Sequence, residues 1–290
     1  MPYMLRTAGL LASLLCGASA LADAIVLRTN DVEYARVDGQ PLLLDLYRLE
    51  GGSAEPLLIW IHGGRWEVGS KEQMPVAALV EHGFALASLD FRPASAARFP
   101  GQIHDIKAAI RFLRAQAGSY GFDASRIGIL GASSGGHLAA LVGTTNNHGE
   151  LEGSLGSHAD QSSSVQAIVS YFGASNLTTI LRQSTPFGLG VRTPALQTLL
   201  GGLPEETAAL ARLASPVFHV DATDPPLLLL HGDQDPQMPI NQSHELEGAY
   251  RSSGGVAQFA VVHGAGHGGD AFFDAARLAL VAEFLDRYLR

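Results

Sequence analysis

Cysteine is nearly missing from this sequence. Its 290 residues include a single cysteine, Cys16, in a segment that we expect to be cleaved off. The mature chain would then carry no thiol, no disulfide bond and no metal site built on cysteine. Histidine is present, but no HExxH motif or other paired spacing of ligands accompanies it, so we expect neither a metal ion nor a cofactor.

Positive charge is also scarce. The chain has 19 Lys and Arg residues against 28 Asp and Glu residues, which gives a net charge of -9 at pH 7. Binding of nucleic acid requires clustered basic residues that neutralise phosphates, so we expect no nucleic-acid partner. An acidic balance of this kind mainly serves solubility.

A hydrophobic run long enough to cross a membrane is lacking near the N-terminus. The apolar stretch there, residues 8–21, follows Arg6 and ends in the small-x-small pattern of residues 20–22. It is shorter than the ~18 to 20 residues that span a bilayer. We therefore predict a signal peptide over residues 1–22 and an exported protein, periplasmic or secreted, without stable membrane insertion. A membrane anchor and a lipid attached to Cys16 are the alternatives.

The rest of the composition fits a globular chain with a large core. Hydrophobic residues make up 47% of the chain and charged residues 16%. No Pro-, Ser- or Gly-rich stretch and no highly charged stretch divides it into halves. We predict one domain over residues 23–290.

Short, continuous apolar runs recur along this domain, and each ends in Gly, His or Asp. Such runs are typical of buried parallel strands. Stretches with helical spacing separate them, for example Ile103, Ile106 and Ile110. The alternation predicts an α/β fold with a mostly parallel central sheet and helices on both faces. The runs are residues 57–61, 84–89, 127–130, 165–171, 227–230 and 258–262.

Three segments depart from this alternation. Asp38-Gly39 lies between two apolar-rich stretches of residues 32–46, which favours an antiparallel hairpin at the start of the sheet. Residues 146–164 are polar, and residues 173–214 hold three prolines between short apolar clusters. We place both as excursions above the sheet, the second as a small cap.

A pentapeptide of the GxSxG type marks the expected nucleophile. Gly131-Ala132-Ser133-Ser134-Gly135 follows an apolar run and precedes residues 137–142, which suit a helix. Glycine on both sides permits a sharp turn that exposes the hydroxyl of Ser133 at the edge of the sheet. The motif alone is weak and also fits a plain turn, but its position between strand and helix favours a nucleophile.

A second glycine-containing loop, His62-Gly63-Gly64-Arg65-Trp66, follows the run of residues 57–61. A loop of this kind can turn backbone N–H groups toward a developing oxyanion. We expect the amides of Gly64, Arg65 and Ser134 to form the oxyanion hole, with the Arg65 side chain in solvent. Trp66 is expected at the floor of the pocket, where it would bind substrate.

The acid and the base come later in the chain. Asp235 lies on the loop after residues 227–230, and His267 lies on the loop after residues 258–262. The order Ser, Asp, His along the chain is that of the α/β-hydrolase triad, in which histidine takes the serine proton and the carboxylate orients the histidine. Asp233 competes with Asp235, and His263 competes with His267. Both competitors lie closer to their strand ends and are interpreted as structural.

Taken together, these stretches resemble the α/β-hydrolase superfamily, and more narrowly its esterase and lipase branch of bacterial feruloyl and acetyl xylan esterase-like proteins, often called the BD-FAE family. The likeness covers nearly the whole mature chain. It includes Asp90-Phe91-Arg92, Phe99-Pro100, residues 123–127, Ser215-Pro216 and residues 224–226. The resemblance implies the α/β-hydrolase fold and a triad of Ser133, Asp235 and His267.

Some residues depart from the family pattern. Arg65 stands where the hormone-sensitive lipase-like branch has a third glycine, and Phe91 replaces a common tyrosine. The Pro often found before the histidine loop is missing. None of these departures removes a reacting group.

These motifs predict a serine hydrolase that cleaves small carboxylic esters, with short or aromatic acyl groups, through an acyl-enzyme. An amide or formamide hydrolase with the same triad is the alternative, and a binding module that keeps the fold without the chemistry is a third hypothesis. The expected partner is a small-molecule ester. The sequence leaves open the acyl and alcohol specificity, which we expect Trp66, the loop after Asn146 and the cap to set, and the oligomeric state.

Overall fold

The computed structural model describes residues 25–146 and 148–290. The predicted signal peptide lies outside the described residues and stays a prediction. Within the described ranges, no helix combines the length and apolar character needed to cross a membrane.

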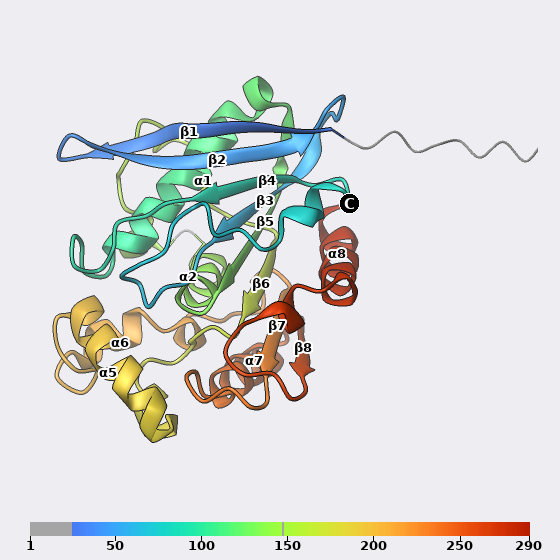
Figure 1. The fold of residues 1–290 in the computed structure, drawn as a ribbon. Helices are drawn as coiled ribbons and strands as arrows, with labels where there is room; N and C mark the ends of the chain where they lie inside the picture. Colours follow the sequence, from blue (N-terminus) through green and yellow to red (C-terminus); the bar gives the residue numbers. More distant parts are fainter. Residues whose placement is uncertain (1–24, 147) are drawn as a thin grey trace, which may run out of the picture.

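The fold is the predicted α/β type: one eight-stranded sheet in the order β1-β2-β4-β3-β5-β6-β7-β8 with helices on both faces (Figure 1). The pairs β1-β2 and β2-β4 are antiparallel, and the five others are parallel. The strands are β1 (Val26–Val37), β2 (Gln40–Leu49), β3 (Glu55–Ile61), β4 (Ala85–Leu89), β5 (Phe122–Ala132), β6 (Ala167–Tyr171), β7 (Leu227–Gly232) and β8 (Ala257–Val262). The helices are α1 (Gly101–Tyr120), α2 (Ser134–Gly143), α3 (Gly149–Glu152), α4 (Ile180–Gln183), α5 (Pro186–Leu200), α6 (Ala208–Leu213), α7 (Asn241–Ser253) and α8 (Ala275–Leu289).

The hairpin at the start of the sheet follows the sequence prediction. Asp38 and Gly39 connect β1 to β2 and have φ angles of 48° and 78°. Positive φ at both central residues matches the right-handed twist of paired strands, and Asp-Gly is a favoured pair for that turn.

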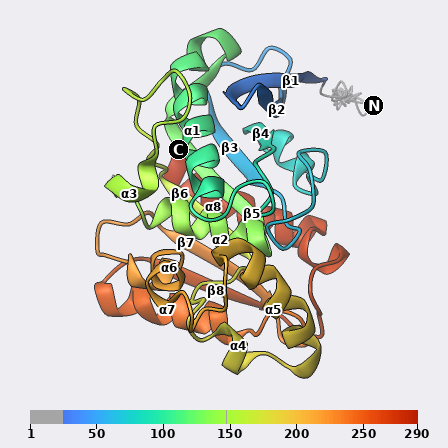
Figure 2. The ribbon, with the colours of Figure 1, turned by 90° about the vertical axis from the view of Figure 1, so that its left-hand side faces the viewer.

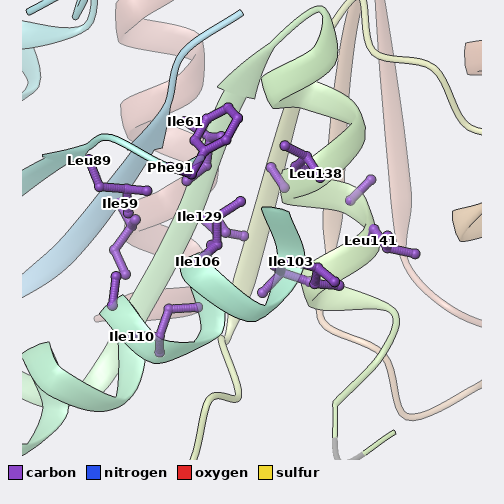
Figure 3. Close-up of a cluster of buried hydrophobic side chains, with 14 of the residues drawn as sticks. Ile59, Ile61, Leu89, Phe91, Ile103, Ile106, Ile110, Ile129, Leu138 and Leu141 are labelled. Carbon is purple, nitrogen blue, oxygen red and sulfur yellow. The ribbon is translucent and has the colours of Figure 1, made fainter. Parts of the chain in front are cut away.

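Two hydrophobic cores flank the sheet because successive strand residues point to opposite faces. Ile59 and Ile61 of β3 join the core beneath α1 and α2, and Figure 3 shows them in one cluster with Ile103 and Ile106. Leu58 and Trp60 face the other way and pack with α8. Both faces of the inner strands, such as β3, β6 and β7, are therefore buried, which explains why these strands read as continuous apolar runs. The edge strand β8 is half-buried.

The two expected excursions differ from each other in the structure. Residues 173–214 contain α4, α5 and α6, which lie at the same end of the molecule as α7 (Figure 2). The described residues 148–164 instead lie along α1, where Arg111 donates to the carbonyls of Glu152 and Leu155 and Arg114 donates to that of Ser164. The division of the chain into a hydrolase domain and a cap stays a prediction.

Candidate active site

Ser133 occupies the sharp turn between β5 and α2. Its φ and ψ angles are 55° and -118°, a conformation that side chains rarely adopt. Its N–H donates to the carbonyl of Tyr171, 2.9 Å away. Any side chain at Gly131 would collide with the carbonyl of Gly135, and any at Gly135 with the carbonyl of Ile61. The two glycines thus allow the strained turn that carries the hydroxyl.

The structure brings His267 between the other two predicted triad residues. Its Nε2 lies 3.0 Å from Oγ of Ser133, and its Nδ1 lies 2.6 Å from Oδ2 of Asp235. A carboxylate only accepts hydrogen bonds, so Nδ1–H donates to Asp235 and Nε2 is left to accept the serine proton. This is the arrangement that makes a serine hydroxyl a nucleophile.

Asp235 is held as a buried carboxylate. Its side chain is fully buried, and its Oδ1 accepts hydrogen bonds from the N–H groups of Gln237 and Met238, both 2.8 Å long. Burial by itself would raise the pKa of Asp235. The hydrogen bonds from His231 and His267 and the charge of His267 outweigh it, so that the pKa lies well below its usual range. Asp235 is therefore ionised and can stabilise the positive charge of His267 when this histidine takes up a proton.

The competing pair, Asp233 and His263, lies apart from the hydrogen bonds that link Ser133, His267 and Asp235. Nδ1 of His263 is 2.8 Å from Oδ2 of Asp233, and the N–H of Gly264 donates to Oδ1 at 2.7 Å. The side chain of His263 is 84% exposed. These contacts join the acid loop to the histidine loop and agree with the structural role expected of both residues.

A hollow of about 280 Å³ opens at the serine. Gly64 and Arg65 line it with Ser133 and His267, as the sequence leads one to expect of the oxyanion loop. The φ angles of Gly64 and Arg65 are 118° and 60°, and a side chain at Gly64 would collide with the carbonyl of Val68. Ser134 is the first residue of α2, where a backbone N–H has no acceptor within its own helix.

Trp66 does not lie in that hollow, contrary to the substrate contact predicted for it. Its side chain is 1% exposed, and its indole N–H donates to Nδ1 of His137 over 3.0 Å. The backbone turns at Arg65 and Trp66, both with positive φ, and directs the indole into the core. Trp66 therefore acts on the site through the position of its loop.

The loop after Asn146 is also remote from this hollow, since none of its described residues lines it. Two residues that the sequence analysis missed do line it: Phe172, whose ring packs 4.8 Å from that of His267, and Gln237. Phe172 follows the last residue of β6, so the rule that ligands bind beyond the carboxyl ends of strands could have found it.

The chain is also similar to known proteins. The BD-FAE family model matches residues 44–250. The chain belongs to the BD-FAE family. That match includes Ser133 and Asp235, whereas His267 lies beyond its end.

Relatives of this BD-FAE chain carry esterase names. It is 31% identical to Esterase LipQ and 32% identical to Esterase LipC, both of Mycobacterium tuberculosis, over 90% and 87% of its own length. It spans only 62% of either relative.

Solved structures show the same α/β-hydrolase fold. A truncated carbohydrate esterase from gut microbiota is 33% identical, with a TM-score of 0.81, and the alignment covers 90% of this chain and 95% of that one. A bifunctional GH43-CE protein of Bacteroides eggerthii is 34% identical, also with a TM-score of 0.81, over 90% of this chain and 35% of that one.

Proposed function

We propose that this protein hydrolyses carboxylic esters through an acyl-enzyme on Ser133. The observation that carries the proposal is the continuous chain of hydrogen bonds from Ser133 through His267 to the buried carboxylate of Asp235. The esterase names of its relatives and neighbours support it.

In the proposed reaction, His267 takes the proton of Ser133 as Oγ attacks the ester carbonyl. The N–H groups of Gly64, Arg65 and Ser134 stabilise the oxyanion, and Asp235 stabilises the imidazolium. His267 then gives its proton to the departing alcohol, which leaves an acyl group on Ser133. Water, activated by the same histidine, releases the acid.

The hollow favours small substrates. At about 280 Å³ it is just below the usual range for ligand pockets, and Phe172 and His267 form part of its wall. We expect short acyl groups to react fastest. An acetylated carbohydrate is a suitable natural class to test, because a carbohydrate esterase from gut microbiota is among the similar solved structures.

The test is a series of p-nitrophenyl esters from acetate to octanoate, measured beside the anilide p-nitroacetanilide. Short esters should react fastest, and p-nitroacetanilide should be cleaved far more slowly. Faster release from the anilide than from the matched acetate would favour an amide hydrolase instead. No hydrolysis of any substrate would favour a binding role.

Export is a separate proposal. It is supported by Arg6, the apolar residues 8–21 and the small-x-small ending at residues 20–22. Expression of the full chain in a bacterial host, followed by N-terminal sequencing of the periplasmic protein, should give a mature protein that begins at Asp23. A full-length protein that stays in the cytoplasm would contradict it.

A further inference from the structure

A second histidine, His231, lies against the acid of the triad. It belongs to β7 and is completely buried. Its Nε2 is 3.0 Å from the carbonyl oxygen of Met238 and 3.4 Å from Oδ2 of Asp235. Its Nδ1 is 2.8 Å from the hydroxyl of Ser243, in α7.

These partners fix which ring nitrogen carries the proton. The carbonyl of Met238 and the carboxylate of Asp235 can only accept, so Nε2 of His231 must carry a proton, which it donates to Met238 with Oδ2 of Asp235 as a longer contact. Nδ1 of the neutral ring is then an acceptor, and the hydroxyl of Ser243 donates to it. The opposite tautomer would leave Nε2 facing two acceptors without a proton.

His231 reaches Asp235 by two routes. The first is direct, from Nε2–H toward Oδ2, the oxygen that also accepts from His267. The second runs through Met238, whose carbonyl binds His231 while its N–H donates to Oδ1 of Asp235. His231 thus holds both carboxylate oxygens of Asp235: Oδ2 directly, and Oδ1 through Met238.

We propose that His231, kept in one tautomer by Ser243, is a positioning residue that orients Asp235 and stabilises its negative charge. It touches no reacting atom, since the residues around the hollow at Ser133 do not include it. The inference rests on the proposed function, because orientation of the acid affects rate only if the triad is catalytic.

The first test compares two substitutions at this position. The amide nitrogen of Gln reaches about as far from the backbone as Nε2 of His, whereas that of Asn reaches only as far as Nδ1. His231→Asn should lower kcat about 10- to 100-fold with little change in KM, the rate equivalent of one lost hydrogen bond to a charged group. His231→Gln should restore most of that loss.

If His231 had a purely structural role, its loss would leave the pH profile of kcat/KM unchanged. Loss of a positioning residue shifts that profile. With the carboxylate less firmly held, the imidazolium of His267 is less stabilised, so the acid limb of kcat/KM should move to lower pH in His231→Asn. His219→Gln serves as the control, since His219 also binds a backbone carbonyl, that of Leu213, and should leave both kcat and the profile unchanged.

The second test does not depend on activity. Nitrogen NMR of the histidine rings, assigned by the signals that His231→Gln removes, should show His231 protonated on Nε2 at neutral pH. Protonation on Nδ1 would overturn the inference whatever the enzyme does. An inactive wild type would refute the proposed function alone, whereas an active wild type with a fully active His231→Asn variant would refute only the role of His231.

Discussion

Trp66 and His137 join the loop of Gly64 and Arg65 to helix α2, which follows Ser133. The indole N–H of Trp66 donates to Nδ1 of His137, and Nε2 of His137 lies 2.6 Å from the carbonyl of Ala214. A carbonyl only accepts, so His137 carries its proton on Nε2 and receives the bond from Trp66 on Nδ1. One buried imidazole therefore connects the loop of Gly64 and Arg65 to α2 and to the end of the 173–214 segment.

Replacing Trp66 with Phe should weaken the fold and slow catalysis. The change leaves Nδ1 of His137 buried without a donor, at a cost of about 1 to 3 kcal/mol in the free energy of unfolding. The loop of the oxyanion donors would also be less firmly held, so kcat should fall while KM changes little. Trp60→Phe removes a comparable bond, to the carbonyl of Gln73, and is the matched control. An equal fall of kcat in both variants would contradict this role of Trp66.

His137 should make the protein sensitive to acid. Burial lowers the pKa of His137 to about 4, whereas an unfolded histidine titrates near ~6.5. Between these values the unfolded chain binds a proton that the folded chain does not, so stability falls as the pH falls from about 6.5 to about 4. The loss should be on the order of 3 kcal/mol, measured by urea unfolding across that range. His137→Gln should flatten the slope, though His62 and His219 add to it in the same direction.

Asp224 should act in the opposite direction. Burial raises the pKa of Asp224 to about 6, above the ~3.9 of an unfolded chain. Between these values the folded state holds a proton that the unfolded state has lost, so stability falls as the pH rises from about 4 to about 6. Asp224→Asn should gain about 1 kcal/mol at pH 7, a value reduced for the partial exposure of this residue.

The remaining acceptor of Asn at position 224 can keep the bond from the N–H of Asp221, 2.8 Å long. Asp221→Asn is the control, because hydrogen bonds from Thr223 lower the pKa of Asp221 and no gain is expected there. An Asp224→Asn variant that is less stable than wild type at pH 7 would contradict the account.

Arg192 should be dispensable for stability although it is buried. Its side chain is 0% exposed, its Nε donates to the carbonyl of Gln237 over 3.3 Å, and its two terminal nitrogens meet no acceptor in the part of the chain that the structure describes. A buried charge with few partners contributes little or destabilises, so Arg192→Met should keep or raise the free energy of unfolding by up to about 2 kcal/mol.

Arg111→Met provides the comparison. Arg111 is also buried, but its terminal nitrogens donate to the carbonyls of Glu152 and Leu155. Its loss should cost about 3 kcal/mol, because those carbonyls are left unpaired. Both values come from urea unfolding, and similar losses in the two variants would refute this interpretation of Arg192.

The strands, the hairpin and the triad residues could be predicted from the sequence because local patterns encode them. The apolar runs predicted six strands, because both faces of the inner strands are buried and the edge strand β8 is half-buried, and Asp38-Gly39 predicted the hairpin. The Ser, Asp and His motifs each follow a strand, and a parallel sheet brings such strand ends together at one edge. For that reason the structure unites Ser133, Asp235 and His267 although His267 lies 134 residues from Ser133.

The direction in which a side chain leaves a loop could not be predicted in this way. Trp66 adjoins two oxyanion residues, yet a positive φ turns it into the core. His231 precedes Asp235 by four residues and reads as an ordinary strand end, and only the distance between its Nε2 and Oδ2 of Asp235 reveals their contact. No local pattern in the polar residues 146–164 predicts their contact with α1. Their carbonyls accept hydrogen bonds from arginines that lie 41 to 50 residues away in the sequence.

The most direct test of the central claim is labelling with a fluorophosphonate, which reacts with activated serines. Intact mass and peptide mapping of the labelled wild type should show one adduct, on Ser133, formed in step with the loss of esterase activity. Ser133→Ala should take no label and lose nearly all activity, and Asp235→Asn should label much more slowly. An adduct on another serine, or full esterase activity in Ser133→Ala, would contradict the account.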